Sequence, residues 1–345
     1  MWLLRPFKTA QRRLNSQKVT LMRLLQIPPK IYRHYSTNRS SSDSSRENGK
    51  AAGYTALAAA VGGGGIWWLT SSLKQKHQTK GMPCFTHAPT DQLAPARGPS
   101  KGDLARILSQ GAYSIPVTHI PGINRYDGSQ LASSSPCEDR FIHGELPSPR
   151  DDGGRWAAWA IFDGHMGWQT ADLLEKQLLP FVQHSLAQAK PDLGEEGSAA
   201  IDGAVQGAIM RAFVRLDDAL MKKISETIES KMPLPDKLAG LMPGYAGSCA
   251  LLSMYDPLTS TLHVACTGNS RAVLGLKRPD GTWEVVPLSL DQTAYNPEEL
   301  ARLQREHPGE KEVVSTKNRR ILGIGLSRAF GDSRWKLSDE LHRDL

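Results

Sequence analysis

The stretch WAAWAIFDGH, Trp156–His165, decides how this chain folds. Its continuous apolar run predicts a short strand covered on both faces. The run ends abruptly at Asp163, Gly164 and His165. The end of a buried strand would hold a carboxylate at a fixed place, and the glycine would let the backbone turn and expose its carbonyl. Both are hard oxygen ligands of the kind that Mg²⁺ or Mn²⁺ prefers.

A second acidic segment precedes this strand, in SSSPCEDRF, residues 133–141. Adjacent acids on a strand point to opposite faces, so one of Glu138 and Asp139 can bind a metal while the other orients a water. His165 adds a group that titrates near neutral pH. An Asp-Gly pair is also typical of a turn, and a Glu-Asp pair of a solvated surface. Spacing alone leaves both interpretations open.

The surrounding pattern indicates an α+β domain rather than a regular βαβ alternation. A helix is expected after the opening strand, with Pro180 near its end. A longer helix is expected over about 200–230, and short strands over 247–289 predict an antiparallel meander. Asn296 and Pro297 predict a helix start, with Glu299 completing a capping box. The apolar stripe expected on the long helix is Val205, Ile209, Phe213, Leu216, Leu220, Ile224 and Ile228.

The positive charge lies at the N-terminus. Residues 1–50 hold 11 Lys and Arg against Asp43 and Glu47, a net charge of +9. Because the whole chain has a net charge of +7, residues 51–345 have a net charge of −2. A folded part without excess positive charge disfavours nucleic-acid binding. The Arg-rich, acid-poor leader predicts an amphipathic helix and a mitochondrial transit peptide over 1–35. An amphipathic surface helix or a disordered tail is the alternative.

An uncharged segment lies between Lys50 and Lys74. Residues 51–73 are long enough to span a bilayer, at about 1.5 Å per helical residue, and predict a transmembrane helix in the inner mitochondrial membrane. Four consecutive glycines from Gly62 lower its helix propensity, so a flexible apolar linker is the alternative. Residues 36–50 are expected to be disordered, 74–117 to form a linker, and 118–345 to form the folded domain.

The ordered motifs resemble the metal-dependent type 2C Ser/Thr protein phosphatases. The chain contains EDRF, FDGHMG, GSCALL, TGNSRAVLG, LSLDQT and LSRAFGD in the order of that family, over roughly residues 121–335. The leader and the context of EDR look most like the mitochondrial pyruvate dehydrogenase phosphatase branch, particularly its fungal members. The resemblance implies an α-β-β-α sandwich of two antiparallel sheets flanked by helices, incomplete at the C-terminus.

The resemblance also assigns roles to the acidic residues. It implies that Asp163 bridges two Mg²⁺ or Mn²⁺ ions, and that Glu138 and the Gly164 carbonyl complete the protein contacts of one ion. Asp139 would position a metal-bound water, and the bridging water would attack phosphorus. His165 would protonate the departing Ser or Thr oxygen.

The sequence departs from the family in three places. Asn269 replaces an Asp associated with a third, weaker metal position, so that position is expected to be weak or empty. Ser134 stands where many members have a phosphate-binding Arg, a difference that the pyruvate dehydrogenase phosphatase branch shares. The chain ends 13 residues after Asp332, before the segments that bring further metal-binding acids. It is therefore expected to be a truncated product or an incomplete gene model.

These observations predict an enzyme, a metal-dependent phosphatase acting on phosphoserine and phosphothreonine of mitochondrial phosphoproteins, among them pyruvate dehydrogenase. The alternative is a catalytically impaired phosphoprotein-binding or regulatory fragment, favoured by the missing ligands and by Asn269. A metal hydrolase acting on small phosphate esters is a third hypothesis.

Overall fold

The computed structural model describes residues 11–14, 17–20, 98–150, 152–189, 198–310, 313–315, 317, 319–338 and 341. The chain divides into two compact units. One includes His119–Gly122 and Ser134–Leu345, and it contains every residue predicted for the active site. The other consists of Ser41–Thr118 and Ile123–Ser133.

The centre of the larger unit is a four-stranded antiparallel sheet in the order β10-β9-β6-β5. Its strands are β5 (Arg140–Pro147), β6 (Arg155–Phe162), β9 (Ala250–Asp256) and β10 (Thr261–Thr267). The opening stretch therefore forms a strand as predicted, and β6 is central because β5 and β9 pair with its two edges.

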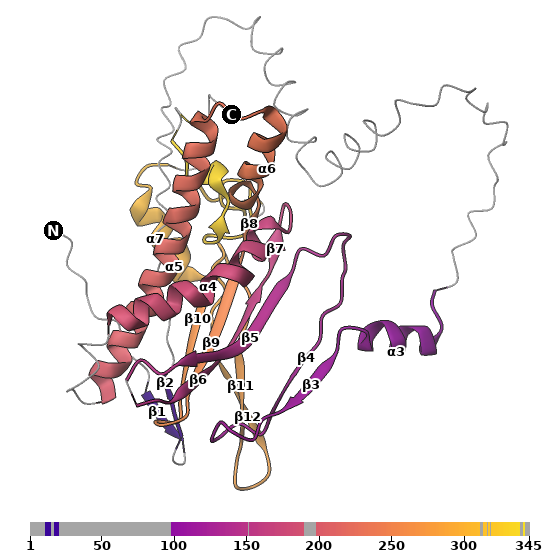
Figure 1. The fold of residues 1–345 in the computed structure, drawn as a ribbon, viewed down its shortest axis with the longest axis vertical. Coiled ribbons are helices and arrows are strands. Elements are labelled where there is room, and N and C mark those ends of the chain that lie inside the picture. The colour runs from indigo at the N-terminus through magenta and orange to yellow at the C-terminus, as the bar shows by residue number, and fades with distance from the viewer. Residues whose placement is uncertain are drawn as a thin grey trace, which may run out of the picture. The chain divides into compact units, whose positions relative to one another are not determined.

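Two helices cover one face of this sheet, α4 (Gln169–Gln188) and α5 (Ser198–Glu229) (Figure 1). Their apolar stripes meet inward-facing side chains of β6 and β9 in one continuous core. Phe162 and Phe213 are fully buried there, and each such side chain contributes roughly 1.5–3 kcal/mol of transfer free energy. All seven residues of the predicted stripe on the long helix are buried, which confirms it.

A two-stranded sheet covers part of the opposite face. It consists of β11 (Val273–Lys277) and β12 (Trp283–Pro287), paired antiparallel. Leu251 and Cys266 of the central sheet pack with Leu274 of this hairpin and its neighbours. The architecture is thus a mixed α+β fold with antiparallel sheets flanked by helices, as predicted, and the meander expected over 247–289 consists of two antiparallel pairs.

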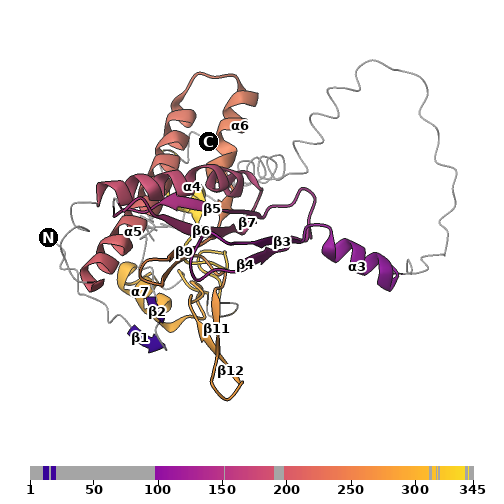
Figure 2. The same cartoon turned by 60° about the horizontal axis from the view of Figure 1, so that its bottom comes forward.

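A small three-stranded sheet continues from the central sheet and carries the functional residues. It contains β7 (Gly164–His165), β8 (Gly247–Ser248) and β13 (Phe330–Gly331), in the order β13-β8-β7. Figure 2 shows β7 next to β6 of the central sheet. The helix α6 (Leu234–Tyr245) leads into β8, and a single 3₁₀ turn, η2 (Ser333–Trp335), follows β13. Three segments that are distant in the sequence therefore meet over a few residues.

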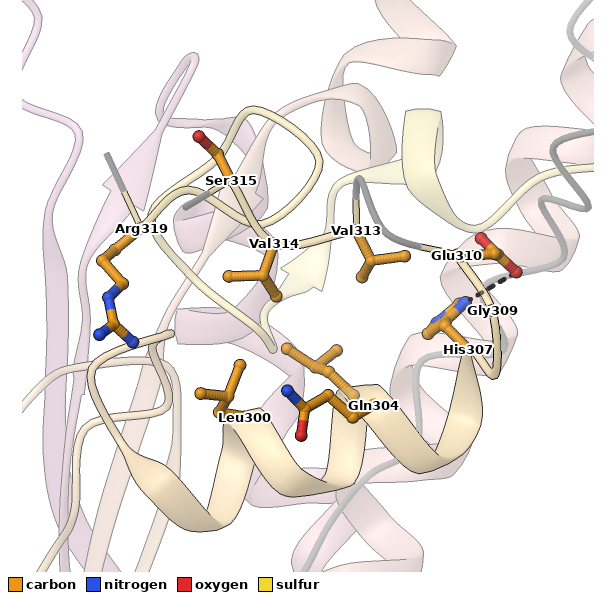
Figure 3. Close-up of a pocket in the computed structure, with 10 residues that line it drawn as sticks. Leu300, Gln304, His307, Gly309, Glu310, Val313, Val314, Ser315 and Arg319 are labelled. Carbon is orange, nitrogen blue, oxygen red and sulfur yellow. Dashed lines mark hydrogen bonds and ion pairs between the residues drawn. The ribbon is translucent and has the colours of Figure 1, made fainter. Parts of the chain in front are cut away.

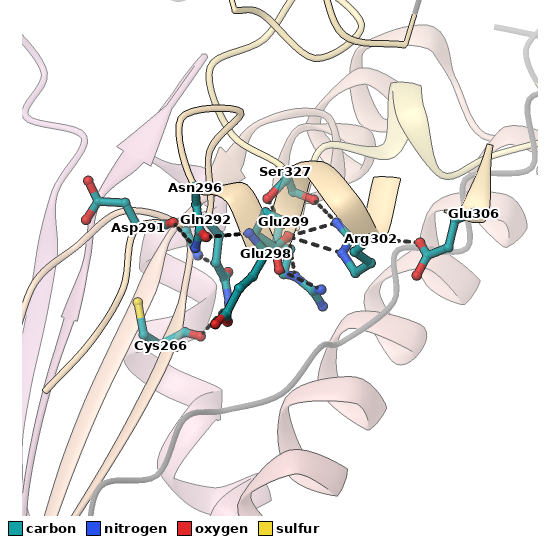
Figure 4. A network of polar contacts seen from close by, with 11 residues as sticks. Cys266, Asp291, Gln292, Asn296, Glu298, Glu299, Arg302, Glu306 and Ser327 are labelled. Atoms are coloured by element: carbon teal, nitrogen blue, oxygen red, sulfur yellow. Dashed lines mark hydrogen bonds and ion pairs between the residues drawn. The ribbon is translucent and has the colours of Figure 1, made fainter. Parts of the chain in front are cut away.

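The helix α7 (Pro297–Glu306) begins as predicted, because the Asn296 side chain accepts a hydrogen bond from the backbone N–H of Glu298 at 3.0 Å. The predicted role of Glu299 in a capping box differs from its contacts in the structure. It is buried and accepts hydrogen bonds from Arg302, Arg328 and Ser327 (Figure 4). Two guanidinium groups outcompete the single cap N–H for this carboxylate, since charge-assisted hydrogen bonds are the stronger ones.

A cavity of about 470 Å³ lies between α7 and a facing segment that contributes Val313, Val314, Ser315 and Arg319 (Figure 3). Its lining is mixed, with Leu300 and Val314 beside His307, whose Nδ1 lies 3.4 Å from a carboxylate oxygen of Glu310. None of the residues predicted for the active site lines it. The cavity is therefore separate from the acidic cluster described below.

The smaller unit contains α3 (Lys101–Ser109), β3 (Tyr113–Pro116) and β4 (Arg125–Gly128). The Ser100 side chain caps α3 by accepting from the Asp103 N–H at 3.1 Å, and β3 and β4 form an antiparallel pair. The stretch predicted as a linker, residues 74–117, thus has regular structure in its last part.

The leader differs from the predicted amphipathic helix where it is described. Residues Gln11–Leu14 form β1 and Gln17–Thr20 form β2, and the two strands pair antiparallel. Val19 and Thr20 are β-branched, which favours a strand over a helix. The predicted disordered segment 36–50 and the predicted transmembrane segment 51–73 lie outside the described residues. Among the helices that are described, none is long and apolar enough to cross a bilayer.

Candidate active site

The pairing of β5 with β6 brings the two predicted acidic segments together. Arg140, the first residue of β5, lies opposite Phe162, the last residue of β6. Because the strands are antiparallel, Glu138 and Asp139 reach the same end of the sheet as Asp163. Contact between these segments is direct: a Cβ on Gly164 would overlap the backbone carbonyl of Glu138. Only glycine permits this approach.

Electrostatic repulsion marks the acidic residues at this end of the sheet. Burial and then the nearby charge of Asp139 raise the pKa of Asp163, although His165 opposes the shift. Among the described residues, the carboxylates of Glu138 and Asp163 have neither hydrogen bonds nor ion pairs. Glu138 is partly buried and Asp163 is exposed, and carboxylates without donors beside a further negative charge are suited to a divalent cation.

The donor set is smaller than a complete metal site. No group of three or more His, Cys, Asp and Glu side chains in the described part of the chain is arranged to hold a metal ion. Glu138 and Asp163 supply carboxylate oxygens, and Gly164 could add its carbonyl oxygen. This oxygen-only set fits the chemistry of Mg²⁺ or Mn²⁺, and water would fill the remaining positions.

Arg140 holds the backbone of the acidic segment, residues 137–139, by hydrogen bonds. Its Nη1 donates to the carbonyl oxygens of Cys137 at 2.9 Å and Asp139 at 2.8 Å. Its guanidinium carbon lies 5.6 Å from the ring centroid of Trp168, within the range of a cation–π contact. The arginine thereby fixes the backbone on both sides of Glu138, and its hydrogen bonds to protein carbonyls explain why the segment EDR holds its shape.

His165 is paired with an acid that was not predicted for the site. Its Nε2 lies 3.0 Å from both carboxylate oxygens of Asp332. Burial disfavours the charged imidazole, but the hydrogen bond to Asp332 and the charges of Asp332, Asp163 and Glu138 outweigh it, so the pKa of His165 is raised. The protonated ring is therefore favoured at higher pH than for a free histidine, which suits a proton donor.

Gly247 makes the room for this pair. It lies between the two outer strands of the small sheet, with His165 of β7 on one side and Gly331 of β13 on the other. A Cβ at position 247 would overlap both Nε2 of His165 and a carboxylate oxygen of Asp332. The absence of a side chain at Gly247, the glycine of the GSCALL motif, thus allows His165 and Asp332 to make contact.

Asn269 stands where the family has an aspartate, and it is connected to the acidic cluster by contacts of Cys249. The Cys249 N–H donates to the carbonyl oxygen of Asp163 at 2.8 Å, and its Sγ lies 3.3 Å from Oδ1 of Asn269. Burial raises the pKa of the Cys249 thiol to about 12, so the thiol stays protonated and can donate to the amide oxygen. The weak or empty third metal position stays a prediction.

The structure brings together all five residues predicted for the site and adds Asp332. The sequence did contain a signal for the added residue. Phe330-Gly331-Asp332 repeats the pattern of an apolar strand end followed by glycine and aspartate that marks Phe162-Asp163-Gly164. What the sequence lacked was any indication that a residue 167 positions away would meet His165.

Comparison with known proteins agrees with the motifs. The family model "Protein phosphatase 2C" matches residues 127–341. A protein phosphatase 2C homologue of Schizosaccharomyces pombe is 41% identical over 253 residues, covering 71% of this chain and 56% of the relative. A mitochondrial pyruvate dehydrogenase phosphatase 1 of Saccharomyces cerevisiae is 37% identical over 231 residues, covering 65% and 40%.

A human relative, mitochondrial pyruvate dehydrogenase phosphatase 2, is 29% identical over 269 residues, covering 64% of this chain and 48% of the relative. The chain spans about half the length of the curated relatives that it matches. The match to the family model covers well over half of the chain and includes Glu138, Asp163, His165 and Asp332. The chain therefore belongs to the protein phosphatase 2C family.

Proposed function

We propose that this protein hydrolyses phosphoserine and phosphothreonine in proteins, with Mg²⁺ or Mn²⁺ held at the end of β6. The convergence of Glu138, Asp139 and Asp163 beside His165, which lies 3.0 Å from Asp332, carries this proposal. The family supplies the reaction class. The acidic cluster supplies the metal-binding oxygens, and the histidine supplies a proton at the same place.

Glu138, Asp163 and the Gly164 carbonyl would hold the cation, and Asp163 would be shared with a second one. When bound, such cations neutralise phosphoryl charge and acidify water. Asp139 lies close enough to Asp163 to raise its pKa, and we assign to it the orientation of the attacking water. Removal of any of these carboxylates would weaken cation binding or misplace the nucleophile.

His165 completes the reaction at the leaving group. As an imidazolium it donates Nε2–H to Asp332, which fixes the ring, and the proton on Nδ1 is the one to transfer. Water oxygen forms the new bond to phosphorus while the bond from phosphorus to the Ser or Thr oxygen breaks. That oxygen takes the proton from His165 and leaves as an alcohol, and inorganic phosphate is the second product.

For the substrate, we propose a mitochondrial phosphoprotein, with phosphorylated pyruvate dehydrogenase as the first to test. The support is that the relatives from Saccharomyces cerevisiae and human are mitochondrial pyruvate dehydrogenase phosphatases, together with the Arg-rich, acid-poor leader of this chain. Attachment to the inner membrane through residues 51–73 rests on their uncharged sequence alone. Carbonate extraction of isolated mitochondria tests it, because an integral protein stays in the pellet and a matrix protein is released.

The activity test uses the full 345-residue chain with Mn²⁺ and a phosphoserine peptide. We expect phosphate release that EDTA abolishes and that Asp163→Asn lowers to background. Asp280→Asn is the matched control, because Asp280 is an exposed acid in the turn between β11 and β12, and its loss should leave the rate unchanged. Equal rates for the wild type and Asp163→Asn, or a Mn²⁺-independent rate, would contradict the proposal.

A further inference from the structure

A buried carboxylate on α5 holds the turn that carries Asp332. Oδ1 of Asp217 accepts a hydrogen bond from the backbone N–H of Gly331 at 3.0 Å, and Oδ2 accepts from Nζ of Lys336 at 2.6 Å. The same Nζ donates to the carbonyl oxygen of Ala329 at 2.8 Å. Asp217 therefore binds the turn at its start directly and at its end through Lys336.

The turn itself adopts a costly backbone conformation. Asp332 has φ 50° and ψ 42°, in the left-handed region, and its side chain is almost fully buried. A non-glycine residue is strained in this region, and the conformation persists only when surrounding contacts hold it. Those contacts are the hydrogen bonds to Asp217 and the one that the Asp332 N–H donates to the carbonyl oxygen of Ala246 at 3.0 Å.

Stability alone is a poor explanation for the buried ion pair. The side chains of Asp217 and Lys336 are about one-tenth exposed, and desolvation of two charges offsets much of their attraction. What the pair does provide is a fixed place for the segment from Phe330 to Asp332. That place decides whether the Asp332 carboxylate reaches Nε2 of His165.

We propose that Asp217 and Lys336 are positioning residues for the histidine–aspartate pair. They act through the turn after β13, hold Asp332 against His165 and touch neither substrate nor cation themselves. The structural part of this proposal stands on the contacts above, and its catalytic consequence rests on the proposed phosphatase function.

The test follows the histidine ring directly. In metal-free full-length protein with ¹³C-labelled histidine, His165→Gln identifies the Cε1–Hε1 signal of His165. Asp217→Asn should displace that signal and leave the signal of His263 in place. Asp256→Asn is the matched control, because Asp256 is also buried and accepts from a cation, Nη1 of Arg150, at 2.6 Å. The charge of Asp256 acts on His263, so this variant should displace the His263 signal and leave that of His165 unchanged.

The kinetic test uses the same variants with Mn²⁺ and a phosphoserine peptide. We expect Asp217→Asn to lower kcat on the order of tenfold to a hundredfold with KM nearly unchanged, and Asp256→Asn to leave both constants near wild type. If Asp217→Asn does not fold, the double variant Asp217→Asn/Lys336→Met replaces it. That variant leaves no buried charge unpaired, so it should fold and still displace the His165 signal.

The outcomes separate the two proposals. A folded Asp217→Asn or double variant whose His165 signal stays in place would overturn the positioning role, whatever the activity. A displaced signal in a protein that shows no phosphatase activity would support the positioning role and contradict the proposed function. Displacement of the His165 signal to the same extent by Asp256→Asn would also overturn the proposal, since the effect would then follow from lost stability.

Discussion

Nε2 of His165 lies 3.0 Å from both carboxylate oxygens of Asp332, a residue 167 positions further along the chain. The contact crosses the small sheet over Gly247, which has no side chain to separate the two groups. A buried carboxylate on one ring nitrogen fixes the ring orientation and stabilises the protonated form. This pair joins the acidic end of β6 to the turn after β13, and the first two predictions below depend on it.

Asp332→Asn should lower kcat by about 10²-fold or more, because the ring would lose the charge that keeps it protonated and oriented. The KM for the substrate should change little, since Asp332 contacts His165 and not the substrate. Steady-state kinetics on a phosphoserine peptide measure both. In the double variant with His165→Asn, Asp332→Asn should add almost nothing, because the two residues act as a unit. Additive losses would show that Asp332 acts independently of the ring.

Gly247→Ala should separate the pair, because the added methyl would overlap both His165 and Asp332. We expect a loss of activity comparable to that of Asp332→Asn, with a measurable drop in melting temperature. Gly275→Ala in β11 is the control. A Cβ there would meet the Trp283 ring at 3.4 Å, an ordinary contact, so activity and melting temperature should stay near those of the wild type.

Asp163→Asn should raise the stability of the metal-free protein, because burial and Asp139 make the ionised carboxylate unfavourable. The variant should also lose the increase in melting temperature that Mg²⁺ or Mn²⁺ gives the wild type. Thermal unfolding with EDTA and with added Mn²⁺ gives both quantities, and calorimetry gives the binding. An equal Mn²⁺ effect in both proteins would place the cation elsewhere.

His263 should make stability depend on pH. Burial lowers its pKa from 6.5 to about 4, and its ring stacks on Trp156 at 5.4 Å between centroids. Between pH 6.5 and 4 the unfolded chain binds a proton that the folded protein does not, so the free energy of unfolding falls as the pH falls through that range. The loss approaches about 1.4 kcal/mol per pH unit.

Urea unfolding at several pH values measures this dependence. His263→Phe keeps an aromatic ring on Trp156 and removes the titrating group, so its stability should fall less steeply between pH 6.5 and 4. His184→Gln, at an exposed position on α4, should retain the wild-type slope. Parallel curves for the wild type and His263→Phe would refute the assignment.

Glu299→Gln should destabilise the protein strongly. Burial alone would raise the pKa of Glu299, but its hydrogen bonds and charge contacts with Arg328 and Arg302 hold it below its usual value. Removal of the negative charge breaks the buried ion pairs of Glu299 with Arg328 and Arg302, although Arg302 keeps its contact with Glu306, and breaking a buried pair costs about 3 kcal/mol. Glu298→Gln, exposed at the neighbouring position, should change the free energy of unfolding by less than about 0.5 kcal/mol.

Local patterns in the sequence were sufficient for most of the elements, and together with the family resemblance they gave five of the six residues of the site. The apolar run before Asp163, the stripe on α5 and the Asn296-Pro297 helix start each depend on neighbours within a few residues, and each is confirmed. Two acidic segments joined by adjacent strands, β5 and β6, could likewise be expected to meet. The family resemblance set the order of the motifs and the chemistry that they serve.

The tertiary structure alone decided which distant residues complete the site. Asp332, Asp217 and Lys336 meet because β13 pairs with β8 and packs on α5, contacts that no short-range periodicity specifies. Glu299 binds two arginines and so leaves its predicted capping role, since buried charges take the strongest partners in space. The amino-acid pattern fixes what each segment can form, whereas long-range packing determines which carboxylate lies against which cation or ring.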